Sequence, residues 1–508
     1  MRWGQFTNWA LCWVLTGVFQ LDSLAQEASE VLSLIQSRRN RLAPINRLPR
    51  DVLILIPDYL DGRERAKIVI NLTHVCQFWR EIFISRASLW TDFHCLGGEK
   101  TRVYLKRSGS APINVWLERA LGLSIDDPFL EIFPNAIRRL KSLSVKSTSG
   151  YLQDIVQHLA HPAPLLGSLS INGSWTMNPA LGPFLPVGVF GGDLSSLRKL
   201  HLQSVRTQLP WRGMNNLTSF SLLHTLQPTV SQILDFLKSA PRLTEIELSF
   251  AAPTSGAQDG RLVTLAYLRR LTISGSQRPS LLLNHLIVPV GAKLSTEFTS
   301  PGPHINDHLP ASLDNLRNLS HFTQIRLRYE PHFVSMRFTG PNGQVSITSS
   351  SPEPDAPCVV PRSLAQFDTS KTRRLEIVGG NFTTELHEAL VSLKNLRTLV
   401  VSGCDDIFTF LLAIHPIFFS DSVVCPELEE LVFRTSQLFD MESMVEVAKD
   451  RALKVAPLKS VKIVSFGEPV QMEGVRELLE HVTHVETSVE VDGEHDYFYE
   501  DTDTDEEH

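Results

Sequence analysis

The sequence has little of what metal binding or catalysis requires. It contains six cysteines among 508 residues (Cys12, Cys76, Cys95, Cys358, Cys404 and Cys425), and no two of them form a CxxC pair. They predict neither a disulfide framework nor a zinc site, and we expect reduced, buried thiols. The 17 histidines are scattered, and the chain lacks a phosphate-binding loop, a nucleotide-binding glycine triplet, a GxSxG elbow and an HExxH pair. We therefore expect no catalytic residue, no cofactor and no metal.

A strong charge of one sign is also missing from most of the chain. Charged residues make up 20% of it, and the net charge is −7. Residues 486–508 carry eleven acidic side chains and no Lys or Arg, so the remaining body has a net charge of +4 (−7 plus 11). So mild a charge does not indicate a nucleic-acid partner. The acidic run itself predicts a disordered tail over 486–508.

No apolar run is long enough to cross a bilayer, which takes about 20 residues. The most apolar stretch lies within residues 1–20, where Trp9 to Phe19 follows Arg2 and precedes Ser23-Leu24-Ala25. This order is typical of a secretory signal, so secretion stays open as an alternative. Five Asn-x-Ser/Thr sequons fit that alternative. We expect no membrane partner.

Residues 21–44 predict an amphipathic helix. Apolar residues recur at alternating spacings of three and four, which places them on one stripe of a helix. The stripe consists of Leu21, Leu24, Ala28, Val31, Ile35, Arg38, Leu42 and Ile45, with Arg38 as an interruption. Pro44 should end the helix, because proline removes a backbone donor and restricts the residue before it. We expect the stripe to pack on the next module, with self-association and disorder as the alternatives. The stripe also argues against cleavage after Ala25.

Residues 45–91 predict a compact group of helices. Leu48-Pro49 opens the first, with the proline in the first turn, where a missing N–H costs nothing. Pro57 should kink the last turn of that helix. The apolar face of the first helix consists of Val52, Leu53, Ile56 and Leu60. The apolar face of the third helix consists of Val75, Cys76, Trp79, Ile82 and Phe83. Leu89-Trp90 ends the group.

The rest of the chain repeats one pattern eleven times: apolar, two free residues, apolar, one free residue, apolar. The middle residues of the copies are Leu143, Leu169, Leu200, Phe220, Ile246, Leu271, Ile325, Leu375, Leu399, Leu431 and Val461. Where copies adjoin, these residues lie 20 to 32 apart, a period typical of a leucine-rich-repeat solenoid. We predict an α/β solenoid over 137–485, after a linker and first rung over 92–136. Asn342-Gly343 between two alternating runs predicts a hairpin near 333–349, either as a rung or as a projecting arm.

The string INRLPRDVLILIPDYLDGRERAKIVINLTHVCQFWREIFISRASLW resembles an F-box. The wider stretch from THVCQFW to INVWLE resembles the F-box proteins that are expanded in mushroom-forming (basidiomycete) fungi, in which irregular leucine-rich repeats follow the F-box. The resemblance implies a small all-α F-box over 45–91 that docks a Skp-family adaptor and, through it, a cullin scaffold. The residues expected to dock the adaptor are Leu48, Pro49, Val52, Ile56, Leu60, Val75, Cys76 and Trp79, although some of them, Trp79 above all, could form the domain's core instead.

The combination predicts the substrate-recognition subunit of a Skp–cullin–F-box ubiquitin ligase, a non-catalytic adaptor of the cytoplasm or nucleus. Protein-substrate contacts are expected at solvent-facing positions of the repeats, because side chains alternate across a strand. These positions are Lys199, His201, Gln203, Glu245, Glu247, Arg270, Thr272, Glu430, Arg434, Ser460 and Lys462. A secreted leucine-rich recognition protein and an F-box scaffold without a role in degradation remain as alternatives.

Overall fold

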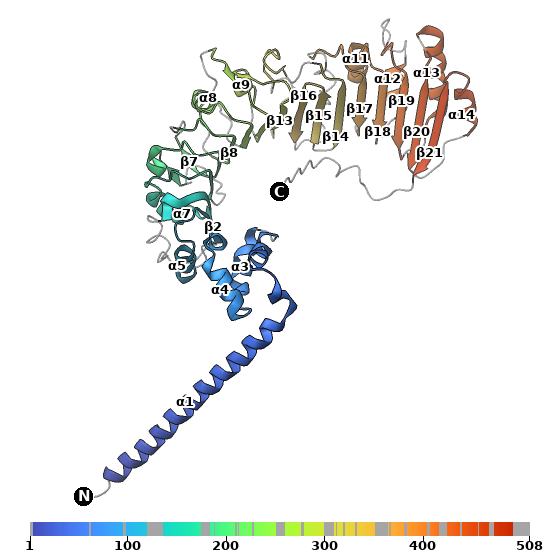
Figure 1. The fold of residues 1–508 in the computed structure, drawn as a ribbon. Coiled ribbons are helices and arrows are strands. Elements are labelled where there is room, and N and C mark those ends of the chain that lie inside the picture. Colours follow the sequence, from blue (N-terminus) through green and yellow to red (C-terminus); the bar gives the residue numbers. More distant parts are fainter. Residues whose placement is uncertain are drawn as a thin grey trace. The chain divides into compact units, whose positions relative to one another are not determined.

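The computed structural model forms two compact units, Met1–Leu166 and Gly167–His508, which we describe separately (Figure 1). The structure describes residues 4–490 except 60–61, 95–97, 119–135, 174–182, 187, 209–210, 212, 226–227, 250–259, 276–278, 299–308, 311, 318–320, 331–332, 351–363, 365–366, 380–383, 404–406, 416–423, 437–438, 456 and 467–471. No helix in this part of the chain is both long enough and apolar enough to cross a bilayer.

The first unit begins with one long helix, α1 (Gly4–Leu42). It joins the expected apolar segment over 1–20 to the expected amphipathic helix, and it runs without a break through Ala25. Ala43 is extended, and Pro44 starts the short 3-10 helix η1 (Pro44–Arg47), so the proline ends α1 as expected. The apolar stripe of α1 is exposed, which contradicts the expectation that it packs on the next module.

Three helices and three 3-10 turns follow the pattern expected for residues 45–91. Helix α2 (Arg50–Leu55) passes directly into η2 (Ile56–Tyr59) at Pro57, because the proline ring cannot continue an α-helix. Helices α3 (Gly62–Leu72) and α4 (Gln77–Ser85) lead to η3 (Ala87–Trp90). Their core is made of Leu53, Val69, Trp79, Ile82, Phe83, Leu89 and Trp90, all buried.

The segment over 92–136 contains more than a linker. Strand β1 (Asp92–His94) and helix α5 (Gly98–Arg107) precede β2 (Ile113–Glu118), the strand expected as the first rung. Strands β1, β2 and β3 (Leu140–Ser147) pair in parallel, and η4 (Ile137–Arg139) and α7 (Ser149–His158) flank β3. Helix α5 is fixed to the preceding helices by Tyr104, whose hydroxyl donates to the Ala66 carbonyl at 2.7 Å and whose ring meets Trp90 edge-on.

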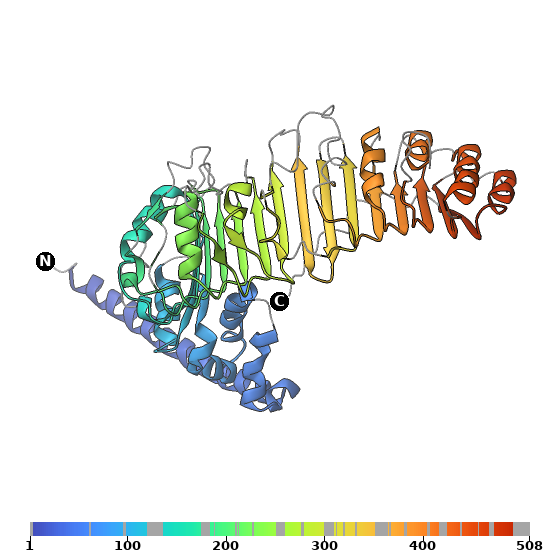
Figure 2. The same ribbon diagram turned by 90° about the horizontal axis from the view of Figure 1, so that it is seen from above.

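The second unit is built on a sheet whose strands are mostly parallel (Figure 2). Its first strands pair in chain order: β4 (Ser168–Gly173), β6 (Lys199–Gln203), β8 (Ser219–Leu223), β9 (Glu245–Ser249), β11 (Arg270–Ser274) and β13 (Lys293–Phe298). Beyond the hairpin region come β17 (Arg374–Val378), β18 (Thr398–Ser402), β19 (Glu430–Thr435), β20 (Ser460–Phe466) and β21 (His484–Glu490). The expected order of N-terminal helices followed by an α/β sheet is confirmed.

The eleven copies of the sequence pattern fall on eleven strands of the two units, and every apolar position of the pattern is buried. Their middle residues lie opposite one another from strand to strand, as in Leu169, Leu200 and Phe220. The same holds for Leu399, Leu431 and Val461. Within the second unit, each of these strands thus contributes one residue to an apolar column, which no single strand could bury alone.

In the two long gaps between its copies, the sequence pattern misses three strands. Strand β13 lies in the first gap between copies, and the pattern fails there because Gly291 and the buried Thr296 occupy two of its apolar positions. The second gap holds β15 (Phe333–Gly340) and β16 (Gly343–Ser350), an antiparallel hairpin closed between Gly340 and Gly343. Strand β16 pairs with β13, and β15 pairs with β14 (Gln324–Glu330), which pairs with β17. The hairpin is therefore part of the sheet and not a projecting arm.

Helices cover the apolar side of this sheet. They are α8 (Val230–Ser239), α9 (Ser280–Leu283), α11 (Thr384–Ser392), α12 (Ile407–Ile414), α13 (Met441–Lys454) and α14 (Met472–Leu478), with η6 at Val189–Gly192. Helix α8 begins with a capping box between Thr229 and Gln232, and its Phe236 ring lies 4.2 Å from that of Phe220 on β8. Two further pairs of short strands, β5 (Phe184–Leu185) with β7 (Arg206–Thr207) and β10 (Val263–Thr264) with β12 (Leu286–Ile287), lie outside the main sheet.

The last strand extends beyond the expected end of the repeats at 485. Residues 486–490, expected in an acidic tail, belong to β21 and pair with β20. Glu486 also forms an ion pair with Lys462 at 2.9 Å. The exposed acidic side chains on this final strand are the kind that discourage further strands from pairing with it. The rest of the expected tail, 491–508, lies outside the described residues.

A buried arginine fixes α13 to the chain entering β19. The side chain of Arg451 is 0% exposed, and its Nη1 and Nη2 donate to the carbonyls of Val424 and Cys425 at 3.0 and 2.9 Å. Burial raises the pKa of the Cys425 thiol to about 12, so this thiol is protonated and uncharged at neutral pH. These two charge-assisted hydrogen bonds offset part of the cost of burying the guanidinium.

Replacing Arg451 with methionine is therefore expected to destabilise the protein. The Arg451→Met variant removes the donor to the Val424 carbonyl and one of the two donors to the Cys425 carbonyl, which also accepts from the Leu428 backbone N–H. The loss should cost about 2 kcal/mol. The midpoint of urea unfolding, followed by circular dichroism, measures this loss. The control is Lys449→Met, an exposed position on the same helix, which should shift the free energy by less than about 0.5 kcal/mol. Equal midpoints for the two variants would contradict the anchoring role.

Candidate partner-binding surfaces

The core of the first unit depends on a contact between η1 and α4. Trp79 is 4% exposed, and its indole N–H donates to the Asn46 side-chain oxygen. The Asn46 amide in turn donates to the Asn40 carbonyl near the end of α1. Trp79 also packs against Phe83, with 5.7 Å between ring centroids. Trp79 therefore belongs to the core, which corrects its assignment as a docking residue: an indole that has both an apolar neighbour and a hydrogen-bond acceptor needs no further partner.

Several large apolar side chains of the same unit face solvent. We use the name docking set for Ile45, Leu48, Pro49, Val52, Leu55, Tyr59 and Val75, which are all exposed. Leu48, Pro49, Val52 and Val75 were expected from the sequence. The others were missed, although Leu55 lies three residues after Val52 and so on the same side of α2. Exposed apolar residues in such number within one small domain are typical of proteins that bind a partner there.

The remaining expected docking residues have mixed positions. Ile56 and Cys76 are half-buried, and Leu60 lies outside the described residues. Val75 precedes α4 and is 54% exposed, so it does not share the buried helix face of Ile82 and Phe83, on which the sequence placed it. This difference arises because α4 begins only at Gln77, with Cys76 as its extended N-cap.

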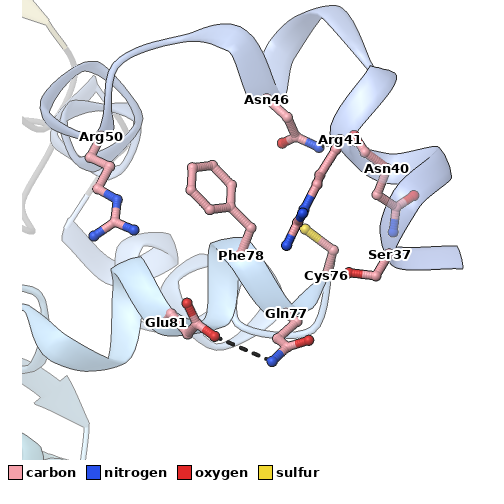
Figure 3. Close-up of a pocket in the computed structure, with 9 residues that line it drawn as sticks. All are labelled: Ser37, Asn40, Arg41, Asn46, Arg50, Cys76, Gln77, Phe78 and Glu81. Atoms are coloured by element: carbon pink, nitrogen blue, oxygen red, sulfur yellow. Dashed lines mark hydrogen bonds between the residues drawn. The ribbon is translucent and has the colours of Figure 1, made fainter. Parts of the chain in front are cut away.

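A cavity of about 370 Å³ lies between the end of α1, the start of α2 and the start of α4. Figure 3 shows its lining, which consists of Ser37, Asn40, Arg41, Asn46, Arg50, Cys76, Gln77, Phe78 and Glu81. The guanidinium of Arg50 lies 5.7 Å from the centre of the Phe78 ring, and Gln77 donates to Glu81 at 3.3 Å. The lining includes Arg50, which follows Pro49, and Cys76, which follows Val75, so the cavity lies next to two segments of the docking set.

The expected substrate positions lie on the sheet face that does not contact the helices. None of the eleven is buried, and each alternates along its strand with a buried apolar residue. Strand pairing aligns them in rows across the sheet. Lys199, Ser219, Glu245, Arg270 and Lys293 form one row, and Glu430 pairs with Ser460 in another. The rows present charges of both signs, which is typical of a surface for proteins and not for polyanions.

A further row, two residues along the strands from the row of Lys199, contains His201, Ser221 and Glu247 on three neighbouring strands. The three residue types occur in hydrolases, but here the serine lies between the other two, and its hydroxyl donates to Glu247 at 2.6 Å. In a catalytic triad the histidine lies between serine and carboxylate and takes the serine proton. Burial lowers the pKa of His201, while Glu247 and Gln203 partly oppose this shift. In this row the serine is thus hydrogen-bonded to the carboxylate, an arrangement that differs from a nucleophile–base pair.

An arginine cluster on β14 and β15 was missed from the sequence. Arg326 lies opposite Arg337 across the antiparallel pair, and Arg328 is two residues along β14. Glu376 lies 3.5 Å from Arg326, and Glu330 lies 2.7 Å from Arg328. The signal in the sequence was the alternation around Leu327, which places both flanking arginines on the solvent face. Arg337 could not be placed there without knowing the register of the hairpin.

Among the residues that the structure describes, no group of three or more His, Cys, Asp or Glu side chains is arranged to hold a metal ion.

Comparison with protein-family models matches residues 45–96 to the family described as F-box-like. The expected F-box is thus confirmed as an F-box-like domain. No curated protein matches the chain. Among solved structures, one similar chain comes from the crystal structure of the Rad7 and Elc1 complex in yeast. It is 13% identical, covers 90% of this chain and 93% of its own length, and has a TM-score of 0.25, which is too low to indicate a shared overall fold.

The Asn46 contact is testable by truncation. Asn46→Ala leaves the buried Trp79 N–H without an acceptor, which should cost about 1–2 kcal/mol. Asn40→Ala is the matched control, because Asn40 takes part through its backbone carbonyl, which the substitution keeps. Thermal unfolding of the two variants compares them directly, and an equally strong effect of Asn40→Ala would argue against the role of the Asn46 side chain.

Protonation of His201 in mild acid should destabilise the folded chain. Because its folded-state pKa is lowered, the unfolded chain binds a proton more readily, so stability is lost as the pH falls below the pKa of the solvated imidazole. Hydrogen exchange at the imidazole C2, read by mass spectrometry, should give His201 a lower pKa in the folded chain than in the same chain unfolded in urea. His201→Gln should reduce the loss of stability in mild acid. A pKa for His201 that is equal or higher in the folded chain would contradict the effect of burial.

Proposed function

We propose that this protein is the substrate-recognition subunit of a Skp–cullin–F-box ubiquitin ligase. The F-box-like domain at residues 45–96 binds a Skp-family adaptor, the adaptor connects it to a cullin scaffold, and the sheet of the second unit holds a protein substrate. The observation that carries the proposal is the family match of a domain that keeps Leu48, Val52 and Val75 exposed. The role would place the protein in the cytoplasm or nucleus.

Within the docking set, direct contacts to the adaptor are assigned to Leu48, Pro49, Val52 and Val75, with Ile45, Leu55 and Tyr59 added. Ile56 and Cys76 contribute at the edge, because they are half-buried. Trp79 acts from the core by holding α4 against η1. An interface of this type draws most of its free energy from a few apolar side chains that become fully desolvated.

We also propose that residues 137–485 form an irregular leucine-rich-repeat solenoid. The apolar columns and the largely parallel pairing support this, since each strand buries its inward residues only against its neighbours. Substrate contacts are assigned to the polar face of the sheet, at Lys199, His201, Gln203, Glu245, Glu247, Arg270, Thr272, Glu430, Arg434, Ser460 and Lys462. The arginine cluster at Arg326, Arg328 and Arg337 extends this surface.

The physical contribution of such a subunit is positioning. Binding of the substrate to the sheet while the F-box-like domain is bound to the ligase raises the local concentration of the substrate lysine near the loaded conjugating enzyme. In this proposal the chain itself breaks no bond.

The docking set is tested with charged substitutions at exposed positions. Val52→Asp with Val75→Asp should weaken binding of a purified Skp-family adaptor by about 100-fold or more, because two carboxylates would be desolvated in the interface. Both side chains are exposed, 44% and 54%, so the fold should persist. The control is Leu453→Asp, which also charges an exposed apolar side chain but lies on α13. Isothermal titration calorimetry measures both.

Two outcomes would separate this proposal from its alternatives. If the double variant binds the adaptor as tightly as the unchanged chain, the assignment of the docking set is wrong. If the adaptor binds normally but no associated protein accumulates when the cullin is inactivated, the chain is an adaptor-binding scaffold without a role in degradation.

A further inference from the structure

The long helix α1 leaves its apolar side exposed. From residue 20 to residue 36 every side chain is exposed, and only Ser37 and Asn40 near the end of the helix are half-buried, where they line the cavity against α4. Seven apolar residues of the helix, Leu21, Leu24, Val31, Leu32, Leu34, Ile35 and Leu42, are 55% to 72% exposed. An apolar stripe of this length in water is typical of a helix that packs against a partner.

We propose that α1 pairs with the α1 helix of a second copy of this chain in an antiparallel two-helix seam. The proposal concerns residues 21–42 and goes beyond the ligase role, since it needs neither the adaptor nor a substrate. Three features of the helix carry it: the spacing of its apolar residues, the distribution of its charges and the position of Arg38.

The spacing of three and four residues is that of a coiled-coil seam, in which each apolar side chain packs between residues of the facing helix. In antiparallel pairing, Val31 lies opposite Ile35 of the second copy and Leu24 lies opposite Leu42. The two-fold axis then passes between Val31 and Ile35, and the two helices bury the same residues. Leu32 and Leu34, on either side of the stripe at its middle, widen the seam where the axis passes.

The charges of α1 are separated along its length. Between residues 20 and 31 the only charged side chains are Asp22, Glu27 and Glu30, and between 32 and 42 the only ones are Arg38, Arg39 and Arg41. Two parallel helices would place like charges side by side, whereas two antiparallel helices place the acidic half of each beside the basic half of the other. Glu27 and Arg41, which flank the same edge of the stripe, come together across the antiparallel seam at both ends.

Arg38 decides between the orientations. It occupies a position within the apolar stripe, so a parallel pair in register would stack two arginines on each other in the seam. In the antiparallel register Arg38 lies opposite Ala28, whose small side chain leaves room for the long one, and next to Glu27 of the second copy. A charge inside a seam is tolerated where it meets an opposite charge and is costly where it meets its like, so it selects the arrangement.

The experiment is sedimentation equilibrium of the full chain, which should show a species with twice the mass of one chain. Val31→Asp with Ile35→Asp places four carboxylates at the two-fold axis and should raise the dissociation constant by about 100-fold or more. Ser33→Asp with Gln36→Asp adds the same charge to the polar face of the same helix and should leave the dimer intact. The proposal is overturned if the chain stays monomeric at all concentrations. It is also overturned if the Val31 and Ile35 substitutions leave the dissociation constant of the dimer unchanged.

A charge exchange tests the antiparallel orientation. Glu27→Arg alone and Arg41→Glu alone should each raise the dissociation constant by about tenfold, since each creates two like-charge pairs across the seam. The double variant Glu27→Arg with Arg41→Glu should restore the original affinity, because both pairs become opposite again. Failure of the double variant to recover overturns the antiparallel register.

Other occupants of the stripe are outcomes of the same measurements. A monomer that binds anionic lipid vesicles through Val31 and Ile35, or one that dimerises only through residues outside α1, would overturn the proposal. Adaptor binding is measured in parallel, and Val31→Asp with Ile35→Asp should leave it unchanged because neither residue belongs to the docking set. The ligase proposal and the dimer proposal can therefore fail independently.

Discussion

The architecture depends on one constraint: a strand of the large sheet cannot bury its apolar residues by itself. Leu200, Leu222 and Leu248 are buried only because neighbouring strands and the covering helices enclose them. The middle residue of each pattern therefore lies opposite the middle residue of the next strand. The register of strand pairing is fixed because a shift by one residue would move the apolar side chains to the solvent face. The same alternation places the polar residues between them on the open face, which is the surface available for a protein partner.

The first unit, in contrast, does not bury all of its large apolar residues. Its helices bury Trp79, Phe83 and Trp90 in a small core and satisfy both indole N–H groups, one on Asn46 and one on the Phe83 carbonyl at 2.8 Å. Apolar residues that this core does not need remain exposed on α2, before α4 and along α1. Exposed apolar surface of this extent is unfavourable in water, and binding of a partner removes it from water. The first unit is therefore suited to contacts with other proteins.

The two groups of exposed apolar residues can serve different partners. Those of the F-box-like domain lie on short elements around a cavity with charged and polar walls, a shape that suits a folded protein. Those of α1 form a straight stripe with acidic residues along one half and arginines along the other, which suits a second helix. If both proposals hold, a dimer formed through α1 carries two copies of the sheet in one assembly.

The sequence by itself determined the repeating strands, the F-box-like helices and the end of α1 at Pro44, because periodic burial and proline geometry are local properties. It could not determine that Trp79 lies in the core while Val52 is exposed, since both are apolar and only packing divides them. Strand β13 stayed hidden because a buried threonine replaced an apolar residue, which the neighbouring strands tolerate. The order β13, β16, β15, β14, β17 was decided by the tertiary structure alone, because pairing joins residues distant in the chain. That order also created the arginine cluster, whose members come together only through the register of a hairpin.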